Sequence, residues 1–272
     1  MTEFSDKVVV VTGGGSGIGA ALCRELGRRG ARVLCADLAA DSARGVVDEI
    51  TKAGGRAIAY PLDVTQTEQV AALVATAVAE HGRIDFMFNN AGISVTGDAR
   101  DLTLTHWRQV IDVNLMGVVY GSDAAYKQMA TQGFGHIVNI ASLAGLIPFP
   151  TNAPYATTKH AVVGLSQSLR AEGEDLGVRV SAVCPGFIQS NIYKATPFIN
   201  VDRERALRNM PFTPVPAERA ANLILRGVLR NDPIIIFPGY ARVVWYLQRL
   251  KAALLNPLHR KGIRDLRKLR GK

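Results

Sequence analysis

The stretch Val8-Val9-Val10-Val11-Thr12-Gly13-Gly14-Gly15-Ser16-Gly17-Ile18-Gly19 decides the fold. An apolar run of strand length passes directly into glycines and then into a helical pattern. A turn of this kind presents backbone N–H groups at the positive end of a helix dipole, which is a favourable place for a pyrophosphate. Glycine permits the positive φ angles of the turn and a close approach of the backbone to a ligand. The stretch therefore predicts the first β-α unit of a dinucleotide-binding site.

The rest of the chain alternates short apolar runs with longer helical patterns. The runs are rich in Val and Ile and lack polar alternation, as expected of strands that are covered on both faces. Repeated β-α-β units predict an α/β fold, a Rossmann-type doubly wound parallel sheet of about seven strands with helices on both faces. No linker divides residues 1–240, so we expect one domain there and an extension over 241–272. The predicted strands are Val8–Val11, Arg32–Ala36, Ala57–Pro61, Ile84–Phe88, Gly135–Ile140, Arg179–Val183 and Ile234–Phe237, and the predicted helices are Ile18–Gly30, Ala39–Ala53, Thr67–His81, Thr105–Gln132, Tyr155–Leu176 and Ala217–Asn231.

Asp37 ends the second apolar run, 18 residues beyond Gly19. An acidic residue about 20 residues after the glycine motif accepts a hydrogen bond from a ribose 2′-hydroxyl and would repel a 2′-phosphate. Leu38 follows it and Ser16 stands in the loop, so no nearby base compensates for the carboxylate. The pattern predicts NAD rather than NADP as the cofactor. The alternative is that Asp37 caps the helix that follows.

Further motifs occur in a fixed order after successive strands. They are Thr12-Gly-x-x-x-Gly-x-Gly19, Asn89-Asn90-Ala91-Gly92 after the fourth strand, Asn114, Ser142 after the fifth strand, Tyr155-x-x-x-Lys159, and Pro185-Gly186 after the sixth strand. Each motif alone is common. The ordered set, over about residues 5–240, resembles the short-chain dehydrogenase/reductase family.

This resemblance implies a cofactor site. Asp63 and Val64 would flank the adenine, and Asn90, Ala91 and Gly92 would line the adenosine ribose side of the cleft. Ile188 and Ser190 would meet the nicotinamide amide, and Ser190 stands where the family often has Thr. The expected cofactor-binding residues are Gly13, Ser16, Gly17, Ile18, Gly19, Asp37, Asp63, Val64, Asn90, Ala91, Gly92, Tyr155, Lys159, Pro185, Gly186, Ile188 and Ser190.

Tyr155 and Lys159 are four residues apart and share one face of a helix. A free tyrosine has a pKa of about 10, and an ammonium ~4 Å away contributes at most about 4 kcal/mol, which would lower the phenol pKa before burial opposes it. We therefore expect Tyr155 to act as general base in alcohol oxidation and as general acid in ketone reduction. The resemblance implies that Lys159 also holds the nicotinamide ribose and that Ser142 bonds the substrate oxygen. It further implies that Asn114 interrupts its helix to hold a water linking Lys159 to solvent.

Two apolar segments would wall the catalytic cleft in the family arrangement. They are the long stretch 187–216 and the segment 143–149 after Ser142. Apolar walls predict a hydrophobic secondary alcohol or ketone as the substrate.

Two other functions remain open. One is a 3-oxoacyl-thioester reductase, because four basic residues of the long stretch could bind an acidic substrate. Such enzymes in this family usually prefer NADPH, and Asp37 argues against NADPH as the cofactor. A non-enzymatic dinucleotide sensor or scaffold on the same fold is the alternative from another class. The intact Ser142, Tyr155 and Lys159 argue against a pure binding protein. The four basic residues are Lys194, Arg203, Arg205 and Arg208.

The net charge of +9 comes from the end of the chain. Lys and Arg total 32 and Asp and Glu total 23, but residues 241–272 hold ten Lys and Arg and one Asp, so residues 1–240 are neutral. An apolar stripe with helical spacing runs through the same segment. A basic amphipathic helix on an anionic membrane, an arm packed on another subunit or on the body, and a solvated basic end are all compatible with this pattern. Nucleic-acid binding has no support from the fold. The stripe consists of Val243, Leu247, Leu250, Leu254 and Leu258.

Three cysteines lie far apart without a C-x-x-C pair, so neither a disulfide framework nor a metal site is expected. No apolar run approaches the ~20 residues that span a bilayer. We expect a cytoplasmic protein. The resemblance implies a homotetramer or homodimer that pairs the helices predicted over 105–132 and 155–176.

Overall fold

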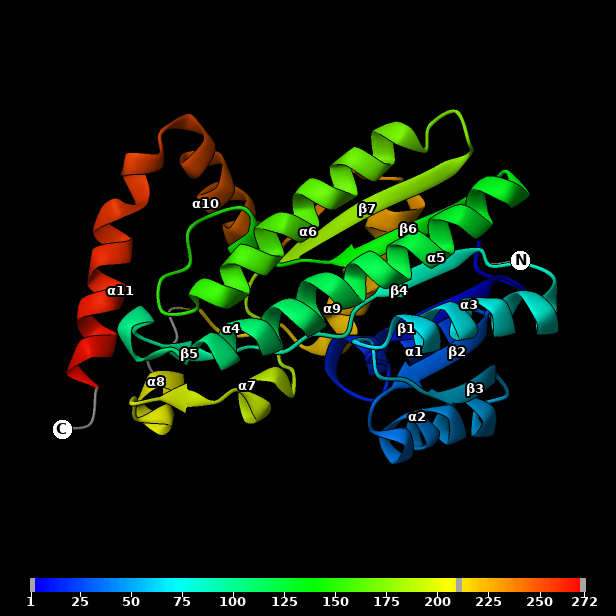
Figure 1. Ribbon diagram of the computed structural model, residues 1–272, viewed down its shortest axis with the longest axis horizontal. Coiled ribbons are helices and arrows are strands. Elements are labelled where there is room, and N and C mark those ends of the chain that lie inside the picture. Colours follow the sequence, from blue (N-terminus) through cyan, green and yellow to red (C-terminus); the bar gives the residue numbers. More distant parts are fainter. Residues whose placement is uncertain (1–2, 209–211, 270–272) are drawn as a thin grey trace.

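A seven-stranded parallel sheet forms the centre of the computed structural model, which describes residues 3–208 and 212–269 (Figure 1). The strand order is β3-β2-β1-β4-β6-β7-β9, so the direction of winding reverses between β1 and β4. This is the predicted doubly wound arrangement, in which ligands bind at the carboxyl ends of the strands beside the reversal. The strands are β1 Val8–Thr12, β2 Arg32–Asp37, β3 Arg56–Pro61, β4 Phe86–Asn89, β6 Gly135–Ile140, β7 Val178–Pro185 and β9 Ile234–Phe237.

Helices cover both faces of this sheet, as predicted (Figure 1). Alternate residues of β1 explain why both faces need covering. Val9 and Val11 pack in the core formed with α1, α2 and α9, whereas Val8 and Val10 pack in the core formed with α3 and α5. The helix α6 lies beside α5 on the second face. The bounds are α1 Gly17–Arg28, α2 Ala40–Lys52, α3 Thr67–His81, α5 Gly117–Gln132, α6 Ala153–Glu172 and α9 Ala217–Leu229.

The helix predicted over 105–132 is divided in the structure. The helix α4 spans Leu104–Ile111, a π-helical turn follows over Asp112–Met116, and α5 then begins at Gly117. The π-helical turn contains Asn114, so the interruption lies at the residue for which the sequence suggested one. A wide turn of this kind is a frequent feature of functional sites.

The stretch after β7 contains more regular structure than the sequence predicted. Two short helices, α7 Ile192–Ala195 and α8 Arg203–Arg208, flank the two-residue strand β8 Phe198–Ile199. The strand β8 pairs in parallel with β5 Thr96–Gly97 to form a second, two-stranded sheet. Strands of two residues are too short to give a periodic sequence pattern, which is why this sheet escaped prediction.

The chain continues past β9 as two helices joined by a short turn. The helix α10 spans Gly239–Leu250, the 3₁₀ turn η4 spans Ala252–Leu255, and α11 spans Asn256–Lys268. Lys251 is extended, with φ −159°, and ends α10, while Pro257 stands in the first turn of α11. The helix α11 returns alongside the second sheet and α8 (Figure 1). Within the described residues, every helix is too short or too polar to cross a membrane.

Candidate active site

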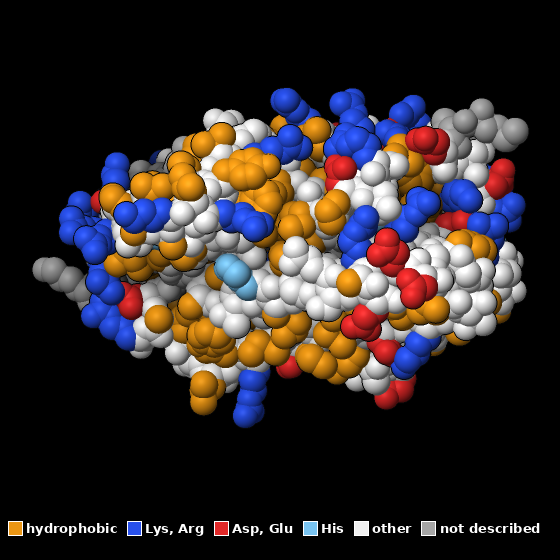
Figure 2. Space-filling view, turned by 90° about the horizontal axis from the view of Figure 1, so that it is seen from above, with side chains coloured by type: hydrophobic (Ala, Val, Ile, Leu, Met, Phe, Trp, Pro, Cys, Tyr) orange, Lys and Arg blue, Asp and Glu red, His pale blue; other side chains and the backbone are white. Residues whose placement is uncertain are grey.

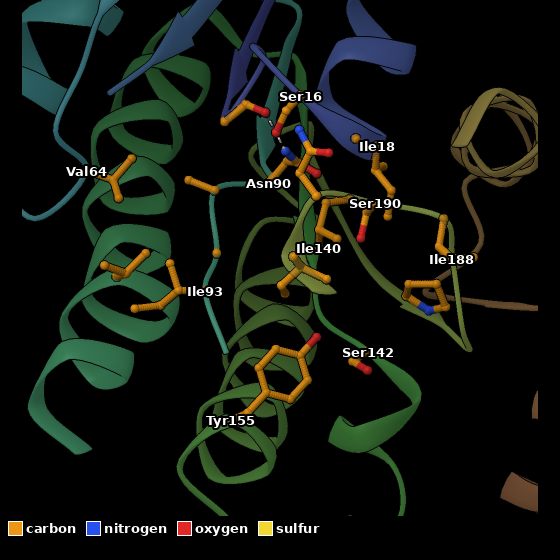
Figure 3. A pocket seen from close by; sticks show the side chains of 18 of the residues that line it. Ser16, Ile18, Val64, Asn90, Ile93, Ile140, Ser142, Tyr155, Ile188 and Ser190 are labelled. Atoms are coloured by element: carbon orange, nitrogen blue, oxygen red, sulfur yellow. Dashed lines mark hydrogen bonds between the residues drawn. The ribbon is translucent and has the colours of Figure 1, made fainter. Parts of the chain in front are cut away.

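A cavity of about 330 Å³ opens where the strand order reverses, at the carboxyl ends of the central strands (Figure 3). All but two of the residues predicted for the site line it. The exceptions, Gly19 and Asn114, lie behind its wall. Asn191, Ile192 and Tyr193 also line it and belong to the stretch 187–216 that was predicted to wall the cleft, whereas the sequence did not single out Leu38, Leu62, Ile93, Val113, Ile140 and Ala141 for the site.

The glycine loop after β1 has the geometry that the sequence predicted. Gly13 and Gly17 have φ angles of 63° and 53°. A Cβ atom on Gly13 would lie 2.8 Å from the Cα of Ala91, and a Cβ atom on Gly19 would collide with the carbonyl oxygen of Gly13. Side chains are therefore excluded here because the loop, the start of α1 and the segment after β4 lie in direct contact.

Asn90 holds this loop from the neighbouring strand end. Its side-chain amide donates to the carbonyl oxygens of Thr12, at 2.9 Å, and Gly13, at 3.1 Å. The Thr12 hydroxyl in turn accepts hydrogen bonds from the backbone N–H groups of Asn90 and Ala91. The carboxyl ends of β1 and β4 are thus fixed to each other by hydrogen bonds.

Asp37 is the last residue of β2 and lines the cavity. Its carboxylate accepts hydrogen bonds from the backbone N–H of Gly15 and from that of Ala39, both at 2.9 Å. Because α2 begins at Ala40 with Ala39 in the capping position, Asp37 does not cap the helix as the alternative interpretation suggested. It instead ties the glycine loop to the end of β2.

Asp63 lies at the side of the same cavity. Its carboxylate accepts hydrogen bonds from the backbone N–H of Thr65, at 2.9 Å, and from the Thr65 hydroxyl, at 2.7 Å. These bonds stabilise the ionised form and lower the pKa of Asp63. One polar end of the cavity therefore carries two carboxyl side chains, those of Asp37 and Asp63.

Ser142 and Tyr155 face the opposite part of the cavity (Figure 3). Ser142 follows β6, and its hydroxyl accepts a hydrogen bond from the Ala144 backbone N–H at 3.1 Å. Tyr155 lies in the first turn of α6. Burial raises the pKa of the Tyr155 phenol, and a hydrogen bond with the Ser142 side chain opposes that rise.

Lys159 lies one helical turn after Tyr155 and is buried. Its Nζ donates a hydrogen bond to the Ile140 carbonyl oxygen at 2.7 Å and lies 5.5 Å from the centre of the Tyr155 ring. Burial lowers the pKa of Lys159 to about 8. The expected lowering of the Tyr155 pKa is wrong for the protein without cofactor, because burial of the phenol raises its pKa by more than the hydrogen bond with Ser142 lowers it.

Asn114 is fully buried in the π-helical turn. Its Oδ1 accepts from the Ile93 backbone N–H at 2.8 Å, and its Nδ2 donates to the Ile93 carbonyl oxygen at 2.9 Å and to the Thr158 hydroxyl at 3.4 Å. Asn114 thus connects the segment after β4 to the helix that carries Tyr155 and Lys159.

A row of aromatic rings lies next to the cavity-lining residue Gly186. The ring centres of Phe149 and Phe187 are 6.2 Å apart, those of Phe187 and Phe212 are 6.3 Å apart, and Phe212 stacks on Tyr240 at 3.9 Å. The Tyr240 hydroxyl accepts a hydrogen bond from the Phe187 backbone N–H at 2.8 Å. Sequence reasoning missed Tyr240, because it belongs to α10 and no local motif marks it.

Comparisons with known proteins agree on the kind of protein to which this cavity belongs. The family model described as short chain dehydrogenase matches residues 7–197. A cyclohexanol dehydrogenase of Acinetobacter sp. is 38% identical over 189 residues, which cover 69% of this chain and 75% of that protein. A 2,5-dichloro-2,5-cyclohexadiene-1,4-diol dehydrogenase of Sphingobium indicum is 37% identical over 195 residues, which cover 72% and 78%.

Two further relatives extend the comparison. The probable oxidoreductase EphD of Mycobacterium tuberculosis is 39% identical over 246 residues, which cover 85% of this chain but only 41% of that longer protein. The crystal structure of a short chain dehydrogenase/reductase from Burkholderia phymatum in complex with NAD superposes with a TM-score of 0.85 at 28% identity, and covers 93% of this chain and 96% of that one. Sequence and structure thus give the same answer, and the chain belongs to the short chain dehydrogenase family of oxidoreductases.

Proposed function

We propose that this protein is an NAD(H)-dependent oxidoreductase that interconverts a hydrophobic secondary alcohol and its ketone. The observation that supports it best is one of placement: Ser142, Tyr155 and Lys159 lie around the same cavity as the glycine loop and Asp37. A redox cofactor and a proton-transferring phenol can therefore meet at one substrate. The similarity to two dehydrogenases of cyclic alcohols supports this substrate class.

The residues present fit NAD. The glycine loop lines the cavity through Gly13, Ser16 and Gly17, and its backbone N–H groups suit a pyrophosphate. The Asp37 carboxylate lies at the cavity wall, where it suits a ribose 2′-hydroxyl and disfavours a 2′-phosphate. When bound, NAD supplies a hydride acceptor, or a hydride donor when reduced. The proposed holding residues are those predicted from the sequence, with Gly19 and Asn114 acting from behind the wall.

Tyr155 is proposed to move the proton. Its raised pKa keeps the phenol protonated at neutral pH, so it can donate a proton to a substrate carbonyl oxygen during reduction. In the reverse direction it accepts the proton of the alcohol. Ser142, on the same side of the cavity, would orient the substrate oxygen by a hydrogen bond. Lys159, when charged, would favour the ionised phenol and assist oxidation.

The surroundings of the cavity favour an uncharged substrate over an acyl thioester. The aromatic row of Phe149, Phe187, Phe212 and Tyr240 is apolar and lies beside the cavity-lining residue Gly186. The arginines that kept the thioester alternative open are engaged locally. Arg203 donates to the Tyr193 carbonyl oxygen, Arg205 pairs with Asp202, and Arg208 pairs with Glu204, while the Lys194 side chain lies outside the described residues.

A substrate and cofactor screen tests the proposal. Turnover with NAD(H) and NADP(H) is measured on alicyclic alcohols and ketones, aryl ketones, steroids, long-chain alcohols, short hydroxy acids and acyl thioesters. We expect bulky apolar alcohols with NAD to be preferred. A preference for acyl thioesters with NADPH would support the reductase alternative, and NAD binding without turnover of any substrate would support a sensor.

The Tyr155→Phe variant tests the proton transfer itself. Removal of the hydroxyl should lower kcat by about 10²- to 10⁴-fold, while NADH binding, followed by fluorescence, stays close to that of the parent protein. Tyr126→Phe, on α5 and away from the cavity, is the matched control and should keep its activity. Undiminished turnover by Tyr155→Phe would refute the assigned role.

A further inference from the structure

The helix α10 packs on the body through one face only. Ala241, Val244 and Trp245 join the core cluster that also holds β9. The opposite face, the η4 turn and the first turn of α11 carry six exposed apolar side chains, and Leu250 reaches 81% exposure. The four on α10 are three or four residues apart and share one face of the helix, and the other two follow on η4 and α11. This row, hereafter the apolar edge, consists of Val243, Tyr246, Leu247, Leu250, Leu254 and Leu258.

The apolar edge is too continuous for an ordinary solvated surface. Single exposed apolar residues are normal on a protein, whereas a continuous row of large ones marks an interaction surface. The packing of α10 does not need these side chains, because the buried residues Ala241 and Leu255 already attach the segment to the core. The edge is therefore available to something outside the described chain.

Basic side chains surround the apolar edge. In the part of the chain that the structure describes, six of them between 242 and 264 form no ion pair with a carboxylate. The nearby Asp265 pairs with Lys268, and Arg267 pairs with Asp98. Figure 2 shows hydrophobic side chains gathered at this end of the molecule with Lys and Arg side chains among and around them. The six are Arg242, Arg249, Lys251, Arg260, Lys261 and Arg264.

Aromatic residues complete the pattern. Tyr246 is 62% exposed, and its ring centre lies 5.0 Å from that of Trp245. The Arg249 guanidinium lies over the Trp245 ring at 5.3 Å. Aromatic rings with one polar edge, next to Lys and Arg, are typical of segments that lie at the boundary between lipid headgroups and acyl chains.

We propose that the apolar edge and its basic surround dock this protein on the surface of an anionic lipid membrane. The apolar side chains would enter the acyl boundary, and the basic side chains would contact the headgroup phosphates. The positive charge of this surface favours an anionic membrane over a second copy of the chain as its binding partner. Two copies that met through this face would bring two sets of unpaired basic residues together, whereas anionic lipids neutralise them.

Vesicle binding by the full chain tests the proposal. The protein is floated with vesicles of phosphatidylcholine, with or without 30 mol% phosphatidylglycerol, at low and high salt. We expect co-flotation with the anionic vesicles, and a loss of binding at high salt because surface charges are screened. Equal binding to both kinds of vesicle, or binding to neither, would overturn the proposal.

Double variants test the basic side chains and the apolar edge separately. Arg260→Gln/Lys261→Gln should weaken binding to anionic vesicles about thirty-fold, since each basic residue near such a surface contributes about a factor of five. Leu250→Ser/Leu254→Ser should weaken it at least about tenfold. Arg44→Gln/Lys52→Gln on α2 and Leu104→Ser on α4 are exposed controls and should bind like the parent protein. Unchanged circular dichroism verifies that each variant is folded.

Sedimentation velocity gives the competing outcome. One outcome is that Leu250→Ser/Leu254→Ser dissociates an oligomer while the parent protein does not bind anionic vesicles. The apolar edge would then be a contact between copies of the chain, and the membrane proposal would be wrong. An unchanged oligomeric state together with lost vesicle binding supports it. Neither readout depends on turnover, so the result is independent of the proposed reaction.

Discussion

The Arg267 guanidinium on α11 donates a hydrogen bond to the Asp98 carboxylate at 2.8 Å, across 169 residues of sequence. Asp98 directly follows β5, and this bond is the main cause that lowers its pKa to about 2. A second contact joins the same regions, because the Asp202 backbone N–H donates to the Leu269 carbonyl oxygen at 3.0 Å. The final helix is thus fastened to the two-stranded sheet β5–β8, next to the segment that borders the cavity.

We predict that Arg267→Gln releases the end of α11 without unfolding the protein. Arg267 is about half exposed, so the loss of global stability should stay below about 1 kcal/mol. Hydrogen exchange should nevertheless become faster in α11 and in residues 198–208. Arg264→Gln, in the same helix, is the control. If Arg267→Gln and Arg264→Gln both exchange at the rates of the parent protein, the pair of Arg267 and Asp98 does not fasten the helix.

The pair of Asp98 and Arg267 should also make the attachment of α11 depend on pH. Because the pKa of Asp98 is lower in the folded protein than in the unfolded chain, the pair contributes stability above about pH 4 and loses it as the pH falls towards 2. Protection factors in α11, which compare each exchange rate with that of the unfolded peptide at the same pH, should fall over that acidic range in the parent protein. In Asp98→Asn, α11 should exchange rapidly at all of these pH values.

A Cβ atom at Gly19 should be far more damaging than one at Gly45. At Gly19 it would collide with the Gly13 carbonyl oxygen, whereas at Gly45, in the exposed part of α2, it meets nothing within 4 Å. Gly19→Ala should destabilise the protein by about 1–3 kcal/mol and weaken NADH binding. Gly45→Ala should stabilise it by up to about 1 kcal/mol, since alanine restricts the unfolded chain. Urea unfolding measures both, and equal effects of the two substitutions would contradict the close contact.

Lys159 should make the protein more stable as the pH rises from 7.5 to 9.5. Its pKa in the folded protein is about 8, below the value of about 10.4 in an unfolded chain. Between these values the unfolded state binds more protons, so the cost of burying the amine diminishes with rising pH. Relative to Lys159→Met, the parent protein should gain about 2 kcal/mol over this interval. Urea unfolding of both proteins at the two pH values measures the gain, and a constant difference would refute the lowered pKa.

The order of motifs predicted most of the fold and the cavity because those residues stand at the ends of apolar strands. Parallel strands bring their carboxyl ends to one edge of the sheet, so the predicted sheet alone places the residues at these ends close together. They are Gly13, Asp37, Asn90, Ser142 and Gly186. This inference needs no side-chain detail. It fails where the contact depends on the path of the chain between elements.

Three features show that limit. Tyr240 contacts Phe187 because β9 pairs beside β7 with Phe237 opposite Pro185, and no local motif in the sequence marks that contact. The pairing of Thr96 with Phe198 involves strands of two residues. The pKa of Tyr155 depends on how deeply α6 buries it, whereas the sequence gives only the distance along the helix to Lys159. Burial and long-range return contacts are properties of the packed structure.

Asp37 should determine the choice between NAD and NADP. Its carboxylate lines the cavity and is fixed by the Gly15 and Ala39 N–H groups, so it cannot turn away from a 2′-phosphate without losing both hydrogen bonds. Asp37→Ser removes the charge, and the ratio of kcat/KM for NADP to that for NAD should rise by about ten- to a hundredfold. Asp41→Ser, in the first turn of α2, removes an exposed negative charge nearby and should leave the ratio unchanged. Because Asp37→Ser also loses the bond to Gly15, binding of NADH should weaken to some extent, which fluorescence titration measures separately. If both variants keep the ratio of the parent protein, the preference for NAD does not come from this carboxylate.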